Sequence, residues 1–136
     1  MSQLKRTDAR KIVFCLLFEK SFNWDKSLEE IINSAIEARD IETDDYILAT
    51  ANGVIDDVEQ IDEYIDRYAV GWSKERISKV DVAILRLAIY ELTHDSGVPT
   101  GVAINEAVEL AKEFSTDEAP AFINGILGSV AKTVGE

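Results

Sequence analysis

The chain has 136 residues, 46% of them hydrophobic, which suits one domain whose core needs neither a disulfide nor a metal. A single cysteine, Cys15, excludes an internal disulfide, and two prolines and seven glycines are few for a β-sandwich or a barrel. The formal net charge of −12 argues against general affinity for nucleic acid.

The charge is unevenly distributed along the chain. The N-terminal basic residues are Lys5, Arg6, Arg10 and Lys11, with Asp8 among them. Side chains of residues 1–11 therefore total +3, whereas those of residues 12–136 total −15. A basic N-terminal arm, residues 1–11, on an acidic body is the main charge feature of the sequence.

The first helix is predicted from residue 7 or 8 to about residue 22. Its inward residues are Ala9, Val13, Leu16 and Leu17. The apolar run 12–18, which includes Cys15 as a buried apolar residue, also fits a buried strand, but the charged residues on both sides favour a helix. Seven residues are too few to cross a bilayer, and no small-residue cleavage site follows them, so we expect a cytoplasmic protein.

The second helix is predicted to open at Ser27, because Glu30 three residues later completes a capping-box pattern. Its apolar stripe consists of Leu28, Ile31, Ile32, Ala35 and Ile36. The helix is expected to end near Asp40.

The clearest helix is predicted over 44–69, where apolar residues recur at spacings of three and four. They are Ile47, Leu48, Ala51, Val54, Ile55, Val58, Ile61, Ile65 and Tyr68. Thr43 can cap this helix, and its acidic side, which includes Asp62, is predicted to be solvated. Gly53 either lets another backbone approach or marks a bend. Unbroken, the helix would be about 39 Å long.

Gly71 ends this segment, and a short helical turn is predicted around 74–77. The next helix, over about 79–93, is apolar nearly all round, which is typical of the central helix of a bundle. Within it, Arg86 needs a carboxylate or carbonyl partner or must reach the rim. The only histidine, His94, is expected to be exposed at the end of this helix.

Two further helices are predicted, one ending at about Phe114 and the last at about Thr133. The inward residues of the first are Val102, Ala103, Ala107, Leu110, Ala111 and Phe114. Ser115 with Glu118 makes a second capping-box pattern, and Pro120 falls in a first turn, where its missing N–H costs little. The elements together predict two small helical bundles that share a core.

The sequence contains no motif for catalysis or for a cofactor. The lone histidine beside a turn predicts neither a catalytic triad nor a pair of histidine metal ligands. There is no Walker loop, and Gly125 and Gly128 lack the flanking glycines and the preceding strand of a dinucleotide fingerprint. We expect no enzymatic activity, no cofactor and no metal.

Three segments of the sequence form a distinctive set. Residues 102–115 read VAINEAVELAKEFS, residues 122–127 read FINGIL, and residues 80–92 read VDVAILRLAIYEL. In this order and spacing they closely resemble the NusB family of transcription antitermination factors. The first is the most specific, and the resemblance extends over the whole length, including Ala9-Arg10 in the arm. It implies an all-α, non-catalytic fold of about seven helices in two small packed bundles, a single domain over 1–136.

The resemblance also implies a function in transcription. NusB-like proteins pair with the ribosomal protein NusE, bind boxA RNA with it, and help the RNA polymerase antitermination complex read through terminators in ribosomal RNA operons. The RNA contacts are expected from Lys5, Arg6, Arg10 and Lys11. Arginine and lysine at a helix start can reach phosphates. Family arms usually hold consecutive arginines, whereas Asp8 interrupts this one, and a frayed terminus without function is the alternative.

For NusE, the resemblance implies a surface on the first helix and on the segment before the central helix. Phe18 stands where a tyrosine is common, Glu75 and Asp81 are the matching acidic positions, and Glu118 is a further candidate. Acidic groups complement a basic ribosomal protein. Phe18 also fits a core residue, and the acids also fit solvated or helix-capping positions. Gly128 replaces an aspartate that is frequent in the family.

Two other functions fit a fold of this kind. An adaptor that binds protein but little RNA would suit the interrupted arm. A NusB-like domain also precedes the catalytic domain of some ribosomal RNA cytosine methyltransferases, but 136 residues leave no room for a methyl-donor-binding domain. Some relatives form homodimers, and the sequence leaves the oligomeric state open.

Overall fold

The computed structural model describes residues 4–71, 76–94 and 97–134, and within these ranges it contains seven helices and no strand. The helices are α1 (Arg6–Lys20), α2 (Leu28–Arg39), α3 (Asp45–Asp56), α4 (Val58–Tyr68), α5 (Lys79–Thr93), α6 (Thr100–Phe114) and α7 (Ala119–Val134). The prediction of an all-α fold is confirmed. None of these helices is long and apolar enough to cross a membrane.

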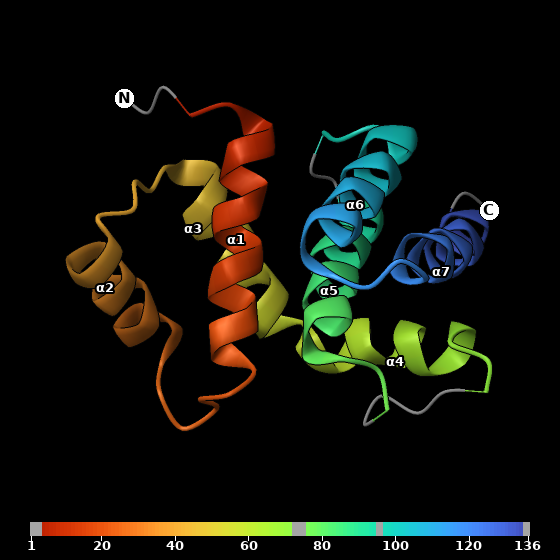
Figure 1. Ribbon diagram of the computed structural model, residues 1–136, viewed down its shortest axis with the longest axis horizontal. Coiled ribbons are helices and arrows are strands. Elements are labelled where there is room, and N and C mark those ends of the chain that lie inside the picture. Colours follow the sequence, from red (N-terminus) through yellow and green to blue (C-terminus); the bar gives the residue numbers. More distant parts are fainter. Residues whose placement is uncertain (1–3, 72–75, 95–96, 135–136) are drawn as a thin grey trace.

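The helices form two groups that meet at α5 (Figure 1). Helices α1, α2 and α3 make up one group, and α4, α6 and α7 surround α5 in the other. Helix α5 also packs against α1 and α3, so it belongs to the core of both groups. The predicted arrangement of two packed helical bundles is therefore confirmed.

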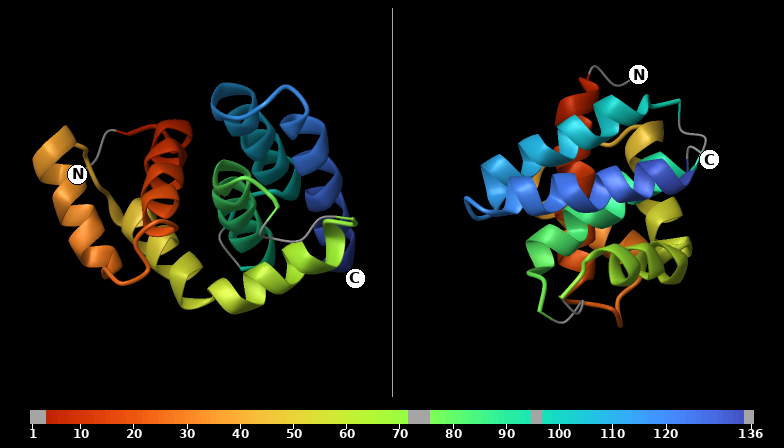
Figure 2. Two further views of the ribbon diagram at one scale, coloured as in Figure 1. Left: turned by 60° about the horizontal axis from the view of Figure 1, so that its bottom comes forward. Right: turned by 90° about the vertical axis from the view of Figure 1, so that its right-hand side faces the viewer.

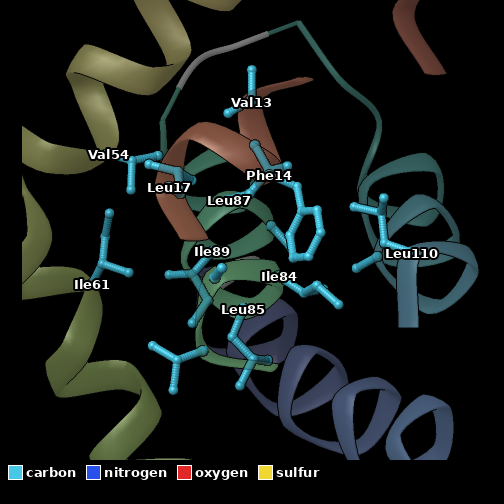
Figure 3. Close-up of a cluster of buried hydrophobic side chains, with 14 of the residues drawn as sticks. Val13, Phe14, Leu17, Val54, Ile61, Ile84, Leu85, Leu87, Ile89 and Leu110 are labelled. Carbon is cyan, nitrogen blue, oxygen red and sulfur yellow. The ribbon is translucent and has the colours of Figure 1, made fainter. Parts of the chain in front are cut away.

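The sequence of α5 explains its central position. Its buried apolar residues, which point in every direction around the helix axis, are Val82, Ala83, Ile84, Leu85, Leu87, Ala88 and Ile89. Figure 3 shows several of them in one cluster with side chains from α1, α3, α4 and α6. Because each neighbouring helix buries its apolar stripe on α5, this helix fixes where the others lie.

Short polar side chains begin several of the helices. The Ser27 hydroxyl accepts a hydrogen bond from the Glu30 N–H at 3.1 Å, as the first capping box predicts. The cap of α3 is Asp44, not Thr43, and its carboxylate accepts from the Ile47 N–H at 2.8 Å. The start of α5 is held in the same way by Ser78, which accepts from the Asp81 N–H.

The prediction of one unbroken helix over 44–69 is wrong. Helix α3 ends at Asp56 and α4 begins at Val58, and Asp57 between them has φ −106° and ψ 15°. Figure 2 shows the elbow that results, which carries α4 under α5 and α7. The apolar spacing runs through the elbow unchanged because both helices pack on α5, so periodicity could not reveal the break.

Gly53 neither marks this bend nor meets another backbone. The side chain of Tyr90 packs against it, and a Cβ atom at this position would lie 2.3 Å from the Tyr90 hydroxyl oxygen. Tyr90 in turn stacks on His94, with 4.2 Å between the ring centroids. His94 is half-buried rather than exposed, and its Nε2 lies 2.6 Å from the Asp57 carboxylate at the elbow.

Several side chains differ in burial from the prediction. Residues expected to face inward but exposed in the structure are Ile36, Leu48, Val102 and Phe114. Asp62, expected on a solvated face, is buried against Arg86, which thereby has the carboxylate partner that its position requires. Cys15 is half-buried, and burial raises the pKa of its thiol. The turn predicted around 74–77 lies partly outside the described residues, which omit 72–75.

Candidate functional site

Helix α1 begins inside the basic arm. The Ala9 N–H donates to the Lys5 carbonyl oxygen, so the basic residues line the first two turns of a formed helix. Lys5 and Arg6 are exposed there. Asp8 lies in the first turn, where a negative charge is favourable beside the positive end of the helix dipole. The acid that interrupts the basic series therefore also stabilises the helix that presents it.

Arg10 lies in the interior, not on the surface. Its side chain is only 4% exposed, and its Nε and Nη2 donate to the two carboxylate oxygens of Glu91 on α5 at 2.9 and 3.1 Å. Its Nη1 also donates to Glu106 on α6 at 3.3 Å. A guanidinium held in this way is closed to a phosphate, so the structure contradicts the prediction that Arg10 contacts RNA. Its role is to hold α1 against α5 and α6.

Tyr46, in the first turn of α3, connects this buried pair to the surface. Its hydroxyl donates to Glu91 Oε2 at 3.1 Å. Burial and the neighbouring Glu91 carboxylate raise the pKa of the Tyr46 phenol, so the hydroxyl keeps its proton and remains a donor. The guanidinium carbon of Arg6 lies 4.0 Å from the centre of the Tyr46 ring, which is the geometry of a cation–π contact.

Carboxylates of α6 border the other side of the arm. The Thr7 hydroxyl donates to Glu106 Oε1 at 2.6 Å, and the Lys11 Nζ lies 3.1 Å from Glu113. The Lys11–Glu113 pair is at the surface, with side chains 39% and 47% exposed. Exposed pairs of this kind contribute little to stability. The Lys11 ammonium can therefore exchange its carboxylate partner for another anion at small cost.

Two of the acidic positions expected to meet a partner, Asp81 and Glu118, lie near the start of α5. The Asp81 carboxylate is mostly buried and accepts a hydrogen bond from the Ser115 hydroxyl at 2.6 Å, a contact that the sequence did not indicate. Glu118, which is exposed, lines a cavity of about 310 Å³ together with Asp81 and Phe122. Asp81 therefore helps to hold the α6–α7 connection on α5, and Glu118 is the more accessible acid. Glu75 lies outside the described residues.

Phe18 is the third member of a row of aromatic rings, which we call the aromatic row: Phe114, Phe14, Phe18 and Phe22. Successive ring centroids are 5.0, 6.2 and 5.0 Å apart. Phe14 is buried and Phe18 half-buried, whereas Phe22 and Phe114 are 58% and 40% exposed. Phe18 therefore contacts the buried Phe14 ring on one side and the exposed Phe22 ring on the other. The spacing of four between Phe14, Phe18 and Phe22 was the signal in the sequence that could have revealed the row.

The same region also holds cations over its aromatic rings. The Lys79 ammonium, in the first turn of α5, lies 5.3 Å from the centre of the Phe22 ring. Trp24, which is 48% exposed, has Lys20 and Arg86 at 5.2 and 5.4 Å from its ring. The C-terminal end of α1 and the loop after it thus present exposed aromatic rings beside the start of α5.

Comparison with known proteins gives consistent matches along the chain. Residues 7–132 match the family model described as the NusB family. A transcription antitermination protein NusB from Acetivibrio thermocellus is 49% identical over 129 residues, which cover 93% of this chain and 88% of that protein. Bacillus subtilis has a protein of the same name that is 37% identical over 131 residues, covering 96% and 98% of the two chains.

Solved structures agree with this result. T. maritima NusB is similar with a TM-score of 0.85 at 34% identity, over 96% of this chain and 93% of that one. A chain from a structure of the antitermination factors NusB and NusE in complex with dsRNA has a TM-score of 0.79 at 24% identity, over 94% and 96%. At that identity, the second likeness shows the fold alone.

Proposed function

The chain belongs to the NusB family and is a transcription antitermination factor, and we propose that it binds boxA-type RNA together with the ribosomal protein NusE. In this role it would help RNA polymerase read through terminators in ribosomal RNA operons. We propose no catalytic step for it. We propose that it acts in the cytoplasm, because bacterial transcription takes place there. The observation that supports RNA binding is the exposed basic start of α1 on a chain of net charge −12.

For the RNA we propose phosphate contacts from Lys5, Arg6 and Lys11. Lys5 and Arg6 are exposed in the first turns of α1, where the helix dipole adds positive potential. Lys11 would exchange Glu113 for a phosphate. The acidic remainder of the chain repels RNA at long range, so these three cations limit where a phosphate backbone can dock.

For NusE we propose the surface formed by the exposed part of the aromatic row and the acids at the start of α5. Phe18 and Phe22 would supply apolar contact area, and Glu118 an accessible negative charge beside the cavity that Asp81 lines. Ribosomal proteins are generally basic, so an acidic rim would steer the partner and fix its orientation. This surface does not include the basic residues of the arm, so one chain can hold RNA and protein at the same time.

The RNA part is tested by electrophoretic mobility shift with a boxA-type RNA, with and without NusE, over a series of salt concentrations. Three phosphate contacts to single-stranded RNA predict a log–log slope of roughly −2. The double variant Arg6→Ala with Lys11→Ala should flatten the slope by about 1.4. Lys132→Ala, which removes an exposed lysine on α7, is the matched control and should leave the slope unchanged. Failure of the parent chain to bind, even with NusE, would refute RNA binding and favour a protein-only adaptor.

The protein part is tested by calorimetric titration with NusE. Glu118→Lys should weaken NusE binding by roughly five- to thirtyfold, because it reverses a charge opposite a basic partner. Glu37→Lys, the same reversal on the exposed face of α2, is the control and should bind NusE as the parent does. Equal affinities for both variants would remove Glu118 from the interface without affecting the RNA result.

A further inference from the structure

We propose that Tyr46 is a positioning residue for RNA binding, which holds the Arg6 guanidinium in place at the start of α1 before RNA arrives. The buried Arg10–Glu91 pair holds Tyr46 in turn. This inference rests on the proposed RNA binding at the arm and assigns a role to a residue that itself touches no RNA.

The argument starts from Glu91, whose carboxylate is almost completely enclosed. Its side chain is 1% exposed and accepts from Arg10 Nε on one oxygen and from Arg10 Nη2 and the Tyr46 hydroxyl on the other. A buried carboxylate that lost these donors would lose hydrogen bonds that compensate for its desolvation. The orientation of Glu91 is therefore fixed, and with it the position of the Tyr46 hydroxyl.

Tyr46 is also fixed at its backbone. It lies in the first turn of α3, where the Asp44 carboxylate caps the helix through the Ile47 N–H. With its backbone in a capped turn and its hydroxyl on Glu91, the ring has one orientation. The Arg6 guanidinium lies over this ring at 4.0 Å, and that of Arg10 lies farther away at 5.8 Å.

The chemistry of the Tyr46 contact leaves Arg6 able to bind. The five N–H donors of a guanidinium lie in its plane, so a ring against one face blocks none of them. A carboxylate partner would instead occupy these donors and neutralise the charge, as Glu91 does to Arg10. An aromatic ring therefore orients the cation without competing with phosphate, and ordering a long side chain in advance lowers the entropic cost of binding.

The test measures binding of a boxA-type RNA in the presence of NusE for two variants of Tyr46. Tyr46→Leu removes the ring and should weaken binding by about two- to fivefold, the range expected for loss of an exposed cation–π contact. Tyr46→Phe keeps the ring but removes the hydroxyl that Glu91 holds, so its loss of affinity should be smaller than that of Tyr46→Leu. Tyr64→Leu, at a half-buried tyrosine on α4, is the matched control and should bind RNA as the parent does.

A double-mutant cycle separates positioning from a general structural effect. In an Arg6→Ala background, Tyr46→Leu should cause no further loss, because the residue through which it acts is gone. Arg6→Lys, an exposed change that conserves charge and leaves the body intact, should weaken binding about as much as Tyr46→Leu.

Three results would overturn the proposal: parental affinity in Tyr46→Leu, an equal loss in the presence and absence of Arg6, or parental affinity in Arg6→Lys. Absence of RNA binding by the parent chain would instead refute the proposed function and the inference with it. The Arg6→Lys result holds even if a Tyr46 variant fails to fold.

Discussion

Two buried arginine–carboxylate pairs join α5 to its neighbours, and they differ in what surrounds them. Arg86 of α5 donates from Nε and Nη2 to the carboxylate of Asp62 on α4 at 2.9 and 2.8 Å, with side chains 9% and 11% exposed. Glu91, farther along α5, accepts from Arg10 of α1 with similar geometry but is more deeply enclosed.

The surroundings decide what each pair does. Next to the Arg86–Asp62 pair lies Trp24, an exposed ring at the surface, so the pair joins two helices and borders solvent. The Arg10–Glu91 pair shares its carboxylate with Tyr46 and its guanidinium with Glu106, and Arg6 lies over the Tyr46 ring. The same kind of ion pair therefore serves packing in one place and, in the other, also holds a residue of the proposed RNA-binding surface.

The largest expected effect is that of Glu91→Gln. It leaves the Arg10 charge buried without its main partner, which should lower the free energy of unfolding by roughly 3–5 kcal/mol. Urea denaturation measures this loss, and RNA affinity should fall slightly as well because the amide keeps only one acceptor oxygen for Arg10 and the Tyr46 hydroxyl. Glu109→Gln, an exposed change on α6, is the control and should stay within about 0.5 kcal/mol of the parent. If Glu91→Gln were as stable as the parent, the deeper burial of the Arg10–Glu91 pair would not make it the more important of the two pairs for stability.

Ile89→Ala tests whether lost stability by itself disturbs RNA binding. Ile89 is fully buried on α5 between Arg86 and Glu91, so truncation should cost roughly 2–5 kcal/mol in urea denaturation. At a temperature where this variant is folded, its RNA affinity should equal that of the parent. A loss of affinity comparable with that of Glu91→Gln would show that the arm responds to any weakening of α5.

Asp62→Asn should have a smaller effect than Glu91→Gln. The Arg86 guanidinium is closer to solvent and keeps contact with the Trp24 ring, so we expect a loss of about 1–3 kcal/mol and no change in RNA affinity. Denaturation of both variants under one set of conditions measures the difference. If Asp62→Asn and Glu91→Gln lowered the free energy of unfolding equally, depth of burial would not explain how much each pair contributes to stability.

The smallest effect on stability is expected for Glu113→Gln. Its pair with Lys11 is exposed, so the free energy of unfolding should change by less than about 0.5 kcal/mol. RNA affinity should nevertheless rise, by roughly twofold, because Lys11 no longer has a competing carboxylate. Fluorescence anisotropy with labelled boxA-type RNA measures this rise, and an unchanged or lower affinity would mean that Lys11 does not contact the RNA.

Much of the fold could be predicted because the apolar pattern is local. Helix α5 has the predicted bounds, since its residues are apolar all round and polar segments flank both ends. The need of Arg86 for a partner also followed from one helix alone. The break at Asp57 did not, because the apolar spacing is the same before and after it and only the packing on α5 turns the chain.

The candidate site was less predictable because its contacts are remote in sequence. Arg10 looks like a surface residue of a basic arm, and its partner Glu91 is 81 positions away. Nothing in the sequence pairs Tyr46 or Glu106 with particular residues of the arm. Composition located the charge of the arm, but the pairing of each charge required the three-dimensional arrangement of α1, α3, α5 and α6.

The contact between Gly53 and Tyr90 has a consequence for how sequences with this fold can diverge. A side chain at position 53 would overlap the far end of the Tyr90 ring, so a larger residue there requires that ring to move or a smaller residue at position 90. A smaller residue at position 90 alone would leave a void between α3 and α5. We therefore expect the two positions to covary across an alignment, with glycine opposite an aromatic residue and a larger residue opposite a short one.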